Sequence, residues 1–98
     1  MEETYRAALA RWGEEAQYDQ AIEECAELIA ALKHYKRGKV DRQAVIDELA
    51  DLSLMLGQLS WMFGRAEVEQ AIRKKREKLG RLLAADPPEA GKEQPDGN

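Results

Sequence analysis

The sequence is poor in the residues that cross-link or interrupt a small fold. Its 98 residues include one cysteine, Cys25, which excludes an intramolecular disulfide and fits a reducing compartment. Prolines number three and β-branched residues are few, whereas the strong helix formers Ala, Leu, Glu, Lys, Arg and Gln dominate. This composition predicts an all-α protein that no disulfide stabilises.

Long apolar runs are also missing. None approaches the roughly 20 residues that a membrane span needs, and the acidic start, Met1 to Thr4, lacks the apolar centre of a signal peptide. With a formal net charge of −4, the chain as a whole would not attract nucleic acid or an anionic membrane. We therefore expect a soluble cytoplasmic protein that binds neither.

Helix-forming segments and their boundary residues predict four helices. The expected helices cover residues 2–11, 14–36, 42–63 and 66–85. Gly38 is a natural C-terminal stop, Asp41 is a good N-cap, and Gly64 closes the helix that Asp41 begins. Because short connections make neighbouring helices antiparallel, we predict an antiparallel helical hairpin with a shorter helix on each side.

The chain has room for a single domain, which we place at residues 1–85. The remaining segment, 86–98, is rich in Gly, Pro and charge and has no large apolar residue, so it is predicted to be a disordered tail. A domain this small is marginally stable alone. Without disulfides, association of copies is the expected additional source of buried surface.

Two acidic residues lie beside an apolar stripe of the long helix. The stripe, which we expect to be the buried face, consists of Ile22, Cys25, Leu28, Ile29 and Leu32. Each helical residue advances about 100°, so Glu24 and Glu27, spaced i and i+3, flank this stripe together. Glu23 points towards solvent.

The next helix places an acidic residue among apolar ones. Glu48 falls between Leu52 and Met55 on the helical wheel, and Asp51 sits at the edge of the same stripe. An unpaired ionised carboxylate there would be costly. Glu48 must therefore be protonated, paired with a Lys or Arg, or bound to a metal ion.

Folding the hairpin about Gly38 places Glu27 opposite Glu48 and Glu24 opposite Asp51. Oxygen ligands without His or Cys select Mg²⁺ or Mn²⁺ rather than zinc, and such an ion suits phosphate oxygens. These four carboxylates are thus a candidate metal site, with a solvated or ion-paired set as the alternative. A di-iron site would need Glu-x-x-His, which is absent.

The acidic segments also carry a family resemblance. Glu23-Glu24-Cys25-Ala26-Glu27 and Glu48-Leu49-Ala50-Asp51 resemble the EExxE…ExxD signature of MazG-like pyrophosphohydrolases, within the all-α nucleoside triphosphate pyrophosphatase superfamily. The resemblance covers roughly residues 12–82. It implies Mg²⁺ or Mn²⁺ bound by Glu24, Glu27, Glu48 and Asp51, with Glu23 orienting water. It further implies hydrolysis of an NTP or dNTP, canonical or aberrant, to the monophosphate and pyrophosphate.

Several other residues are candidate substrate contacts. Lys74, Lys78 and Arg81 suit a triphosphate, although Lys78 stands where many relatives carry Asn. Trp12 would stack on a base or anchor the packing, and Lys36 would steer a triphosphate or complement a helix C-terminus. Relatives assemble as dimers or tetramers, so the resemblance implies a homo-oligomer that completes a four-helix-type bundle.

Two other functions stay open. A phosphoribosyl-ATP pyrophosphohydrolase would share the metal chemistry, and the sequence contains nothing specific to it. A non-catalytic helical oligomerisation or regulatory module would keep the fold alone, but the presence of all four acidic residues counts against it.

Overall fold

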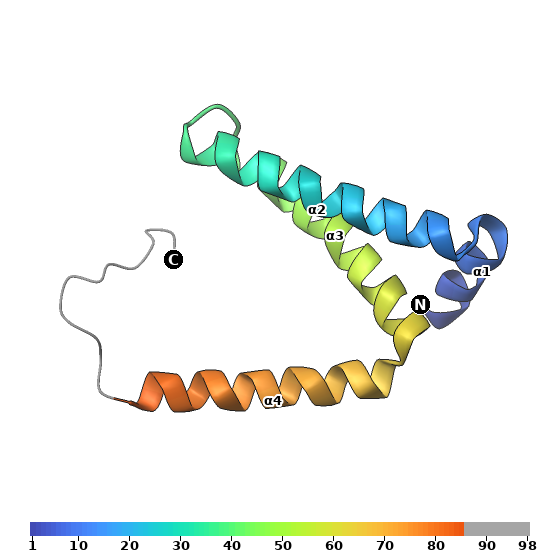
Figure 1. Ribbon diagram of the computed structural model, residues 1–98. Coiled ribbons are helices and arrows are strands. Elements are labelled where there is room, and N and C mark those ends of the chain that lie inside the picture. Colours follow the sequence, from blue (N-terminus) through green and yellow to red (C-terminus); the bar gives the residue numbers. More distant parts are fainter. Residues whose placement is uncertain (86–98) are drawn as a thin grey trace. The chain divides into compact units, whose positions relative to one another are not determined.

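The computed structural model describes residues 1–85, which are almost entirely helical (Figure 1). The helices are α1 (Glu2–Trp12), α2 (Glu14–Lys36), α3 (Arg42–Phe63) and α4 (Arg65–Ala84). No strand occurs among the described residues, so the all-α prediction is confirmed. The predicted helix ends differ from these bounds by at most one residue. The predicted tail, residues 86–98, lies outside the described residues.

Helices α2 and α3 form the predicted antiparallel hairpin (Figure 1). Gly38, in the connection, adopts the left-handed φ of 72° that glycine tolerates best. Asp41 then caps α3, because its Oδ1 accepts a hydrogen bond from the Ala44 N–H at 3.1 Å. The turn and the cap together fix where the second arm of the hairpin begins.

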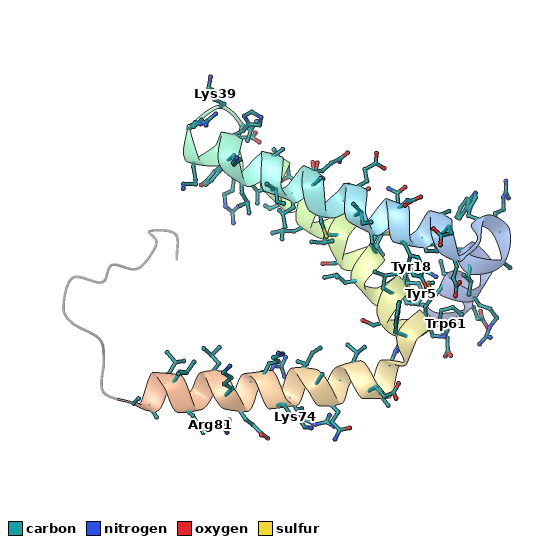
Figure 2. All side chains as sticks on the ribbon, in the orientation of Figure 1. Tyr5, Tyr18, Lys39, Trp61, Lys74 and Arg81 are labelled. Carbon is teal, nitrogen blue, oxygen red and sulfur yellow. The ribbon has the colours of Figure 1, made fainter. Side chains whose placement is uncertain are left out.

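Helix α1 packs against α3 through Tyr5. The Gln58 Nε2 donates a hydrogen bond to the Tyr5 carbonyl oxygen at 3.0 Å, and the Tyr5 and Trp61 ring centres lie 6.5 Å apart (Figure 2). The Trp61 Nε1 donates to Glu2 Oε2 at 3.2 Å. Gly57 makes room for this packing, since a Cβ atom there would overlap the Tyr5 hydroxyl.

The expectation that the large apolar stripe of α2 is buried is wrong for the single chain. Ile22 and Ile29 are 66% and 59% exposed. The buried positions of α2 are instead Gln17, Ala21 and Ala31. These residues lie along one edge of the stripe, where Leu28 is half-buried, and their small or slender side chains allow α2 to approach its neighbours closely. Large apolar side chains consequently remain on the outside.

The described residues divide into two compact units, one over Met1–Arg65 and one over residues 66–85. The second unit contains α4, whose apolar residues Ile72, Leu79 and Leu82 are exposed. None of the helices within residues 1–85 combines the length and the apolarity of a membrane span. Each unit is described by itself.

The close contact between Gly57 and Tyr5 predicts the effect of a small substitution. Gly57→Ala should destabilise the protein by about 1–3 kcal/mol, because the buried Tyr5 ring must move to admit the new methyl group. Gly80→Ala, in open space on α4, is the matched control and should be neutral or stabilise by up to about 1 kcal/mol. Urea denaturation followed by circular dichroism measures both. Equal effects would contradict the packing of Tyr5 over Gly57.

Candidate metal centre

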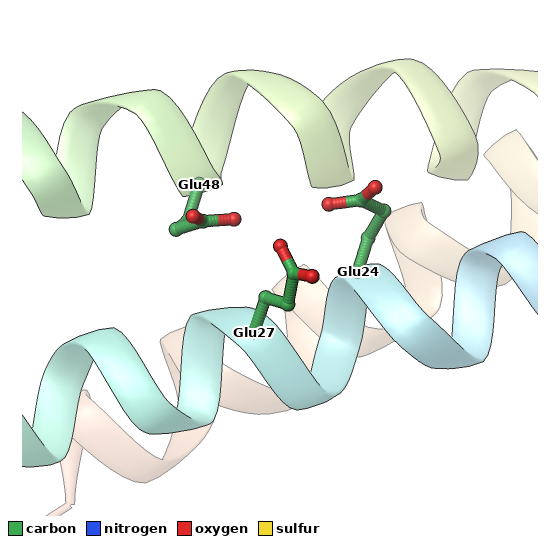
Figure 3. Close-up of side chains that lie close together, drawn as sticks. All are labelled: Glu24, Glu27 and Glu48. Atoms are coloured by element: carbon green, nitrogen blue, oxygen red, sulfur yellow. The ribbon is translucent and has the colours of Figure 1, made fainter.

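Three carboxylates converge between α2 and α3. Glu24 and Glu27 extend from α2 and Glu48 extends from α3, and all three point into the space between the helices (Figure 3). Each offers one oxygen atom, and these oxygens lie within 4.8 Å of one another. The structure therefore brings together three of the four ligands that the sequence predicts.

Two of these carboxylates have an oxygen atom without a partner. Glu24 Oε1 and Glu48 Oε1 are buried and make no hydrogen bond among the described residues. The other oxygen of Glu24 accepts a hydrogen bond from Gln20 Nε2 at 2.7 Å. Because a buried acceptor without a partner loses its hydration at a cost, these two atoms destabilise the cluster, and a bound group that satisfied them would remove this cost.

No cationic side chain supplies that partner. The one salt bridge within the described residues joins Arg6 to Glu2, with 3.7 Å between nitrogen and oxygen, and involves none of the three carboxylates. The alternative in which a Lys or Arg neutralises Glu48 is thus not realised in this part of the chain.

The surroundings of Glu48 make its charged form unfavourable. Burial raises the pKa of Glu48 above its ordinary value, and the negative charges of Glu27, Asp51 and Glu24 raise that pKa further. A bound cation would offset both the hydration that Glu48 loses by burial and the repulsion from the neighbouring carboxylates. The electrostatics of the cluster therefore favour either a shared proton or a positive ion.

The donor set fits a hard divalent ion. It contains carboxylate oxygens only, which Mg²⁺ and Mn²⁺ prefer over softer metals. Oxygens on opposite sides of Mg²⁺ lie about 4.2 Å apart, twice a bond of about 2.1 Å. The three carboxylate oxygens, within 4.8 Å of one another, are close to this spacing. Three protein ligands would leave coordination positions for substrate oxygens.

The remaining predicted acidic residues lie outside this set of three. Asp51 is exposed on α3, but it is near enough for its charge to raise the pKa of Glu48. Glu23 is exposed on α2, as its position on the wheel predicts. A direct role for either residue in metal binding or catalysis stays a prediction.

The predicted substrate contacts lie on three different helices. Trp12, at the end of α1, is 63% exposed, and Lys36 is the exposed last residue of α2. Lys74, Lys78 and Arg81 are exposed on α4 and belong to the second unit (Figure 2 labels Lys74 and Arg81). Their contact with a triphosphate stays a prediction.

The structure also shows residues that the sequence did not single out. His34 and Asp47 line an open hollow of about 410 Å³ together with Glu27 and Glu48, which gives the carboxylates access to solvent. Gln20 binds Glu24, and its position four residues earlier on the same helix was the available signal. His34 lies on the same face of α2 as Glu27, because it follows Glu27 by seven residues, which is about two helical turns.

No protein-family model, curated protein or solved structure matches this chain. The metal-binding hypothesis rests on the geometry of the three carboxylates and on the acidic motifs of the sequence.

The raised pKa of Glu48 predicts how the stability of the metal-free protein depends on pH. Well below the ordinary pKa of a glutamate, near 4.5, Glu48 is protonated in both the folded and unfolded chain. As pH rises, the unfolded chain ionises first, so stability falls until pH passes the folded-state pKa. Glu48→Gln should therefore raise the Tm of the metal-free protein at pH 7 and change it little at pH 3.5.

Glu23, an exposed residue next to Glu24 on α2, provides the control for this measurement. Glu23→Gln removes one negative charge from the solvent side of α2 and should leave the pH dependence of Tm unchanged. Thermal unfolding at both pH values, in the presence of a chelator, measures the effect. A Glu48→Gln protein less stable than wild type at pH 7 would contradict the proposed surroundings of this carboxylate.

Proposed function

We propose that this chain is a magnesium-dependent nucleoside triphosphate pyrophosphohydrolase of the MazG-like kind, acting in the cytoplasm. It would convert an NTP or dNTP into the monophosphate and pyrophosphate, with Mn²⁺ able to replace Mg²⁺. The observation that carries this proposal is the convergence of Glu24, Glu27 and Glu48, two of which hold a buried oxygen without a partner. The EExxE…ExxD motif supplies the class of reaction.

The three carboxylates would have different roles in the reaction. A divalent ion between them would neutralise the triphosphate and polarise the attacked phosphorus. Glu24 and Glu48 would hold the ion through their buried oxygens, whereas Glu27, whose side chain is more exposed, would face the attacking water. That carboxylate would accept the proton of the attacking water while a bridging P–O bond breaks.

The geometry also weighs against the competing functions. A non-catalytic helical module has no need for buried carboxylate oxygens without partners, because apolar residues at those positions would pack at lower cost. A phosphoribosyl-ATP pyrophosphohydrolase would use the same carboxylates. A panel of substrates separates that activity from the proposed one.

Hydrolysis of nucleotides tests the proposal directly. With Mg²⁺ and a panel of canonical and damaged NTPs and dNTPs, the protein should release pyrophosphate rather than orthophosphate. Glu48→Gln should lower kcat by roughly 100-fold or more, since it removes a metal ligand. Asp19→Asn, which removes an exposed carboxylate of α2 outside the cluster, is the matched control and should retain full activity. No turnover of any substrate, or turnover unchanged in Glu48→Gln, refutes the proposal.

The same protein is proposed to be a homo-oligomer, a dimer or tetramer, because one side of its hairpin exposes apolar residues. The exposed side chains of α2 are Ile22, Cys25, Ile29 and Leu32, and those of α3 are Leu49, Leu56 and Phe63. On a helical wheel with about 100° per residue, each row lies roughly 70–100° away from the side of its helix that faces the other helix. The sense of this rotation is the same for both helices when each is viewed from its own N-terminus, and the two helices are antiparallel. They therefore share one face, which a second hairpin would cover to complete a four-helix-type bundle.

A charge placed in this apolar face should separate the copies. Ile29→Lys should shift the protein from oligomer to monomer in sedimentation equilibrium, because the lysine would be buried against apolar side chains. Asp19→Lys, which places a lysine at an exposed position on another side of α2, should leave the oligomer intact. A wild-type protein that is still monomeric at about 100 µM would have a dissociation constant for self-association weaker than that concentration. This result would overturn this part of the proposal.

A further inference from the structure

Gln20 lies one helical turn before Glu24 on α2, and its amide is hydrogen-bonded to that carboxylate. The Gln20 Nε2 donates to Glu24 Oε2 at 2.7 Å. Because a carboxylate that binds a cation is ionised and only accepts hydrogen bonds, the amide must turn its nitrogen towards it. A bond of this length is typical of hydrogen bonds in which one partner is ionised.

The two oxygen atoms of Glu24 have different surroundings. Oε2 has Gln20 as its partner, whereas Oε1 is buried and has no hydrogen-bond partner among residues 1–85. Glu24 is also one of the three carboxylates that each offer an oxygen within 4.8 Å of the others. The hydrogen bond therefore restrains the rotation of a carboxylate that still has a buried oxygen to offer to an ion.

A second pair of the same kind shows what is particular to Gln20. On α3 the Gln43 Nε2 donates to Asp47 Oδ1 at 2.8 Å, again across four residues. Pairs of glutamine and a carboxylate at this spacing stabilise an exposed helix slightly. Asp47 is exposed and lies outside the cluster of three, so helix stabilisation is a complete explanation of the pair on α3. The same explanation does not account for the buried Oε1 of Glu24.

An oriented carboxylate is a better metal ligand than a freely rotating one. When the orientation is already fixed by a hydrogen bond, less side-chain freedom is lost as the ion binds. The bond from Gln20 also favours the ionised form of Glu24, which is the form that binds a cation. Both effects act on the affinity of the metal centre through Glu24.

The divalent ions that prefer oxygen ligands differ in how strict their geometry is. Mg²⁺ requires nearly octahedral coordination with bonds of about 2.0–2.1 Å. Ca²⁺ accepts about six to eight oxygens at roughly 2.3–2.6 Å in flexible arrangements. A carboxylate that is held in one orientation therefore benefits Mg²⁺ more than Ca²⁺, which can adapt to a rotating ligand.

From these contacts we infer that Gln20 is a positioning residue of the metal centre, and that its hydrogen bond to Glu24 favours Mg²⁺ over Ca²⁺. The role is indirect, because Gln20 acts on the ion through the orientation of Glu24. The inference rests on the metal centre of the proposed function, but it does not depend on hydrolysis of a nucleotide.

Competition between ions measures this selectivity. Mn²⁺ is the probe, because the electron paramagnetic resonance signal of the free ion falls as the full-length protein binds it, and Mg²⁺ or Ca²⁺ then displaces it. Gln20→Met removes the donor at an exposed position and keeps a similar helix propensity. It should raise Kd for Mg²⁺ by about tenfold or more and Kd for Ca²⁺ by a smaller factor.

The pair on α3 provides the matched control. Gln43→Met removes the corresponding donor to Asp47 and should leave Kd for both ions unchanged. Circular dichroism should show the same helix content in the two variants. If Gln20→Met raises Kd for Mg²⁺ and Ca²⁺ by the same factor, or changes neither, the inference is wrong, because general damage to the site would affect both ions alike.

The same titrations separate this inference from the proposed function. Mg²⁺ selectivity that depends on Gln20, in a protein that hydrolyses no nucleotide, would support the positioning role and refute the pyrophosphohydrolase. Hydrolysis together with ion selectivity that is unchanged in Gln20→Met would support the enzyme and refute the positioning role. A wild-type protein that binds no Mn²⁺ at concentrations up to about 1 mM would refute both.

Discussion

The contact between α2 and α3 is the interaction on which the rest of the structure depends. Its α2 side includes the small buried residues Ala21 and Ala31, and Glu24 lies between them. This close approach brings Glu48 of α3 to within reach of Glu24 and Glu27, where two carboxylate oxygens lose water without gaining a partner. The hairpin therefore concentrates negative charge inside its own interface. A cation at that place would stabilise the fold and supply the chemistry of the proposed reaction at once.

The same contact explains why so much apolar surface is exposed. Because small and acidic residues occupy the α2 side of the interface, the large apolar side chains Ile22, Ile29 and Leu32 are left outside. A small domain with so thin a core gains stability most readily by association. The proposed association of copies and the candidate metal centre therefore follow from the same packing: the small and acidic residues of α2 that face α3 leave the bulky apolar side chains on the outside.

The sequence predicts the helices well because their ends depend on local chemistry. Gly38 and Asp41 determine the turn and the cap whatever else the chain contacts, and the acidic pairs follow from their spacing. The face of α2 that meets α3 is harder to predict. On the helical wheel the buried face of α2 overlaps only the edge of the apolar stripe at Leu28, and Ile22 and Ile29 on the rest of the stripe stay exposed. Pairs such as Tyr5 and Gln58 lie far apart in the chain, so no local pattern reveals them.

Gln20 links the features that the sequence left separate. Its Nε2 donates a hydrogen bond to Glu24 Oε2, and the buried Oε1 of Glu24 is left without a partner among the described residues. The hydrogen bond requires Glu24 to act as an acceptor, and the ionised carboxylate that binds a cation is the better acceptor. Gln20 also lines the cavity of about 480 Å³ between α1, α2 and α3. One turn of α2 thus separates the candidate metal centre from this cavity. A rigid helix is well suited to hold the separation of the two places constant.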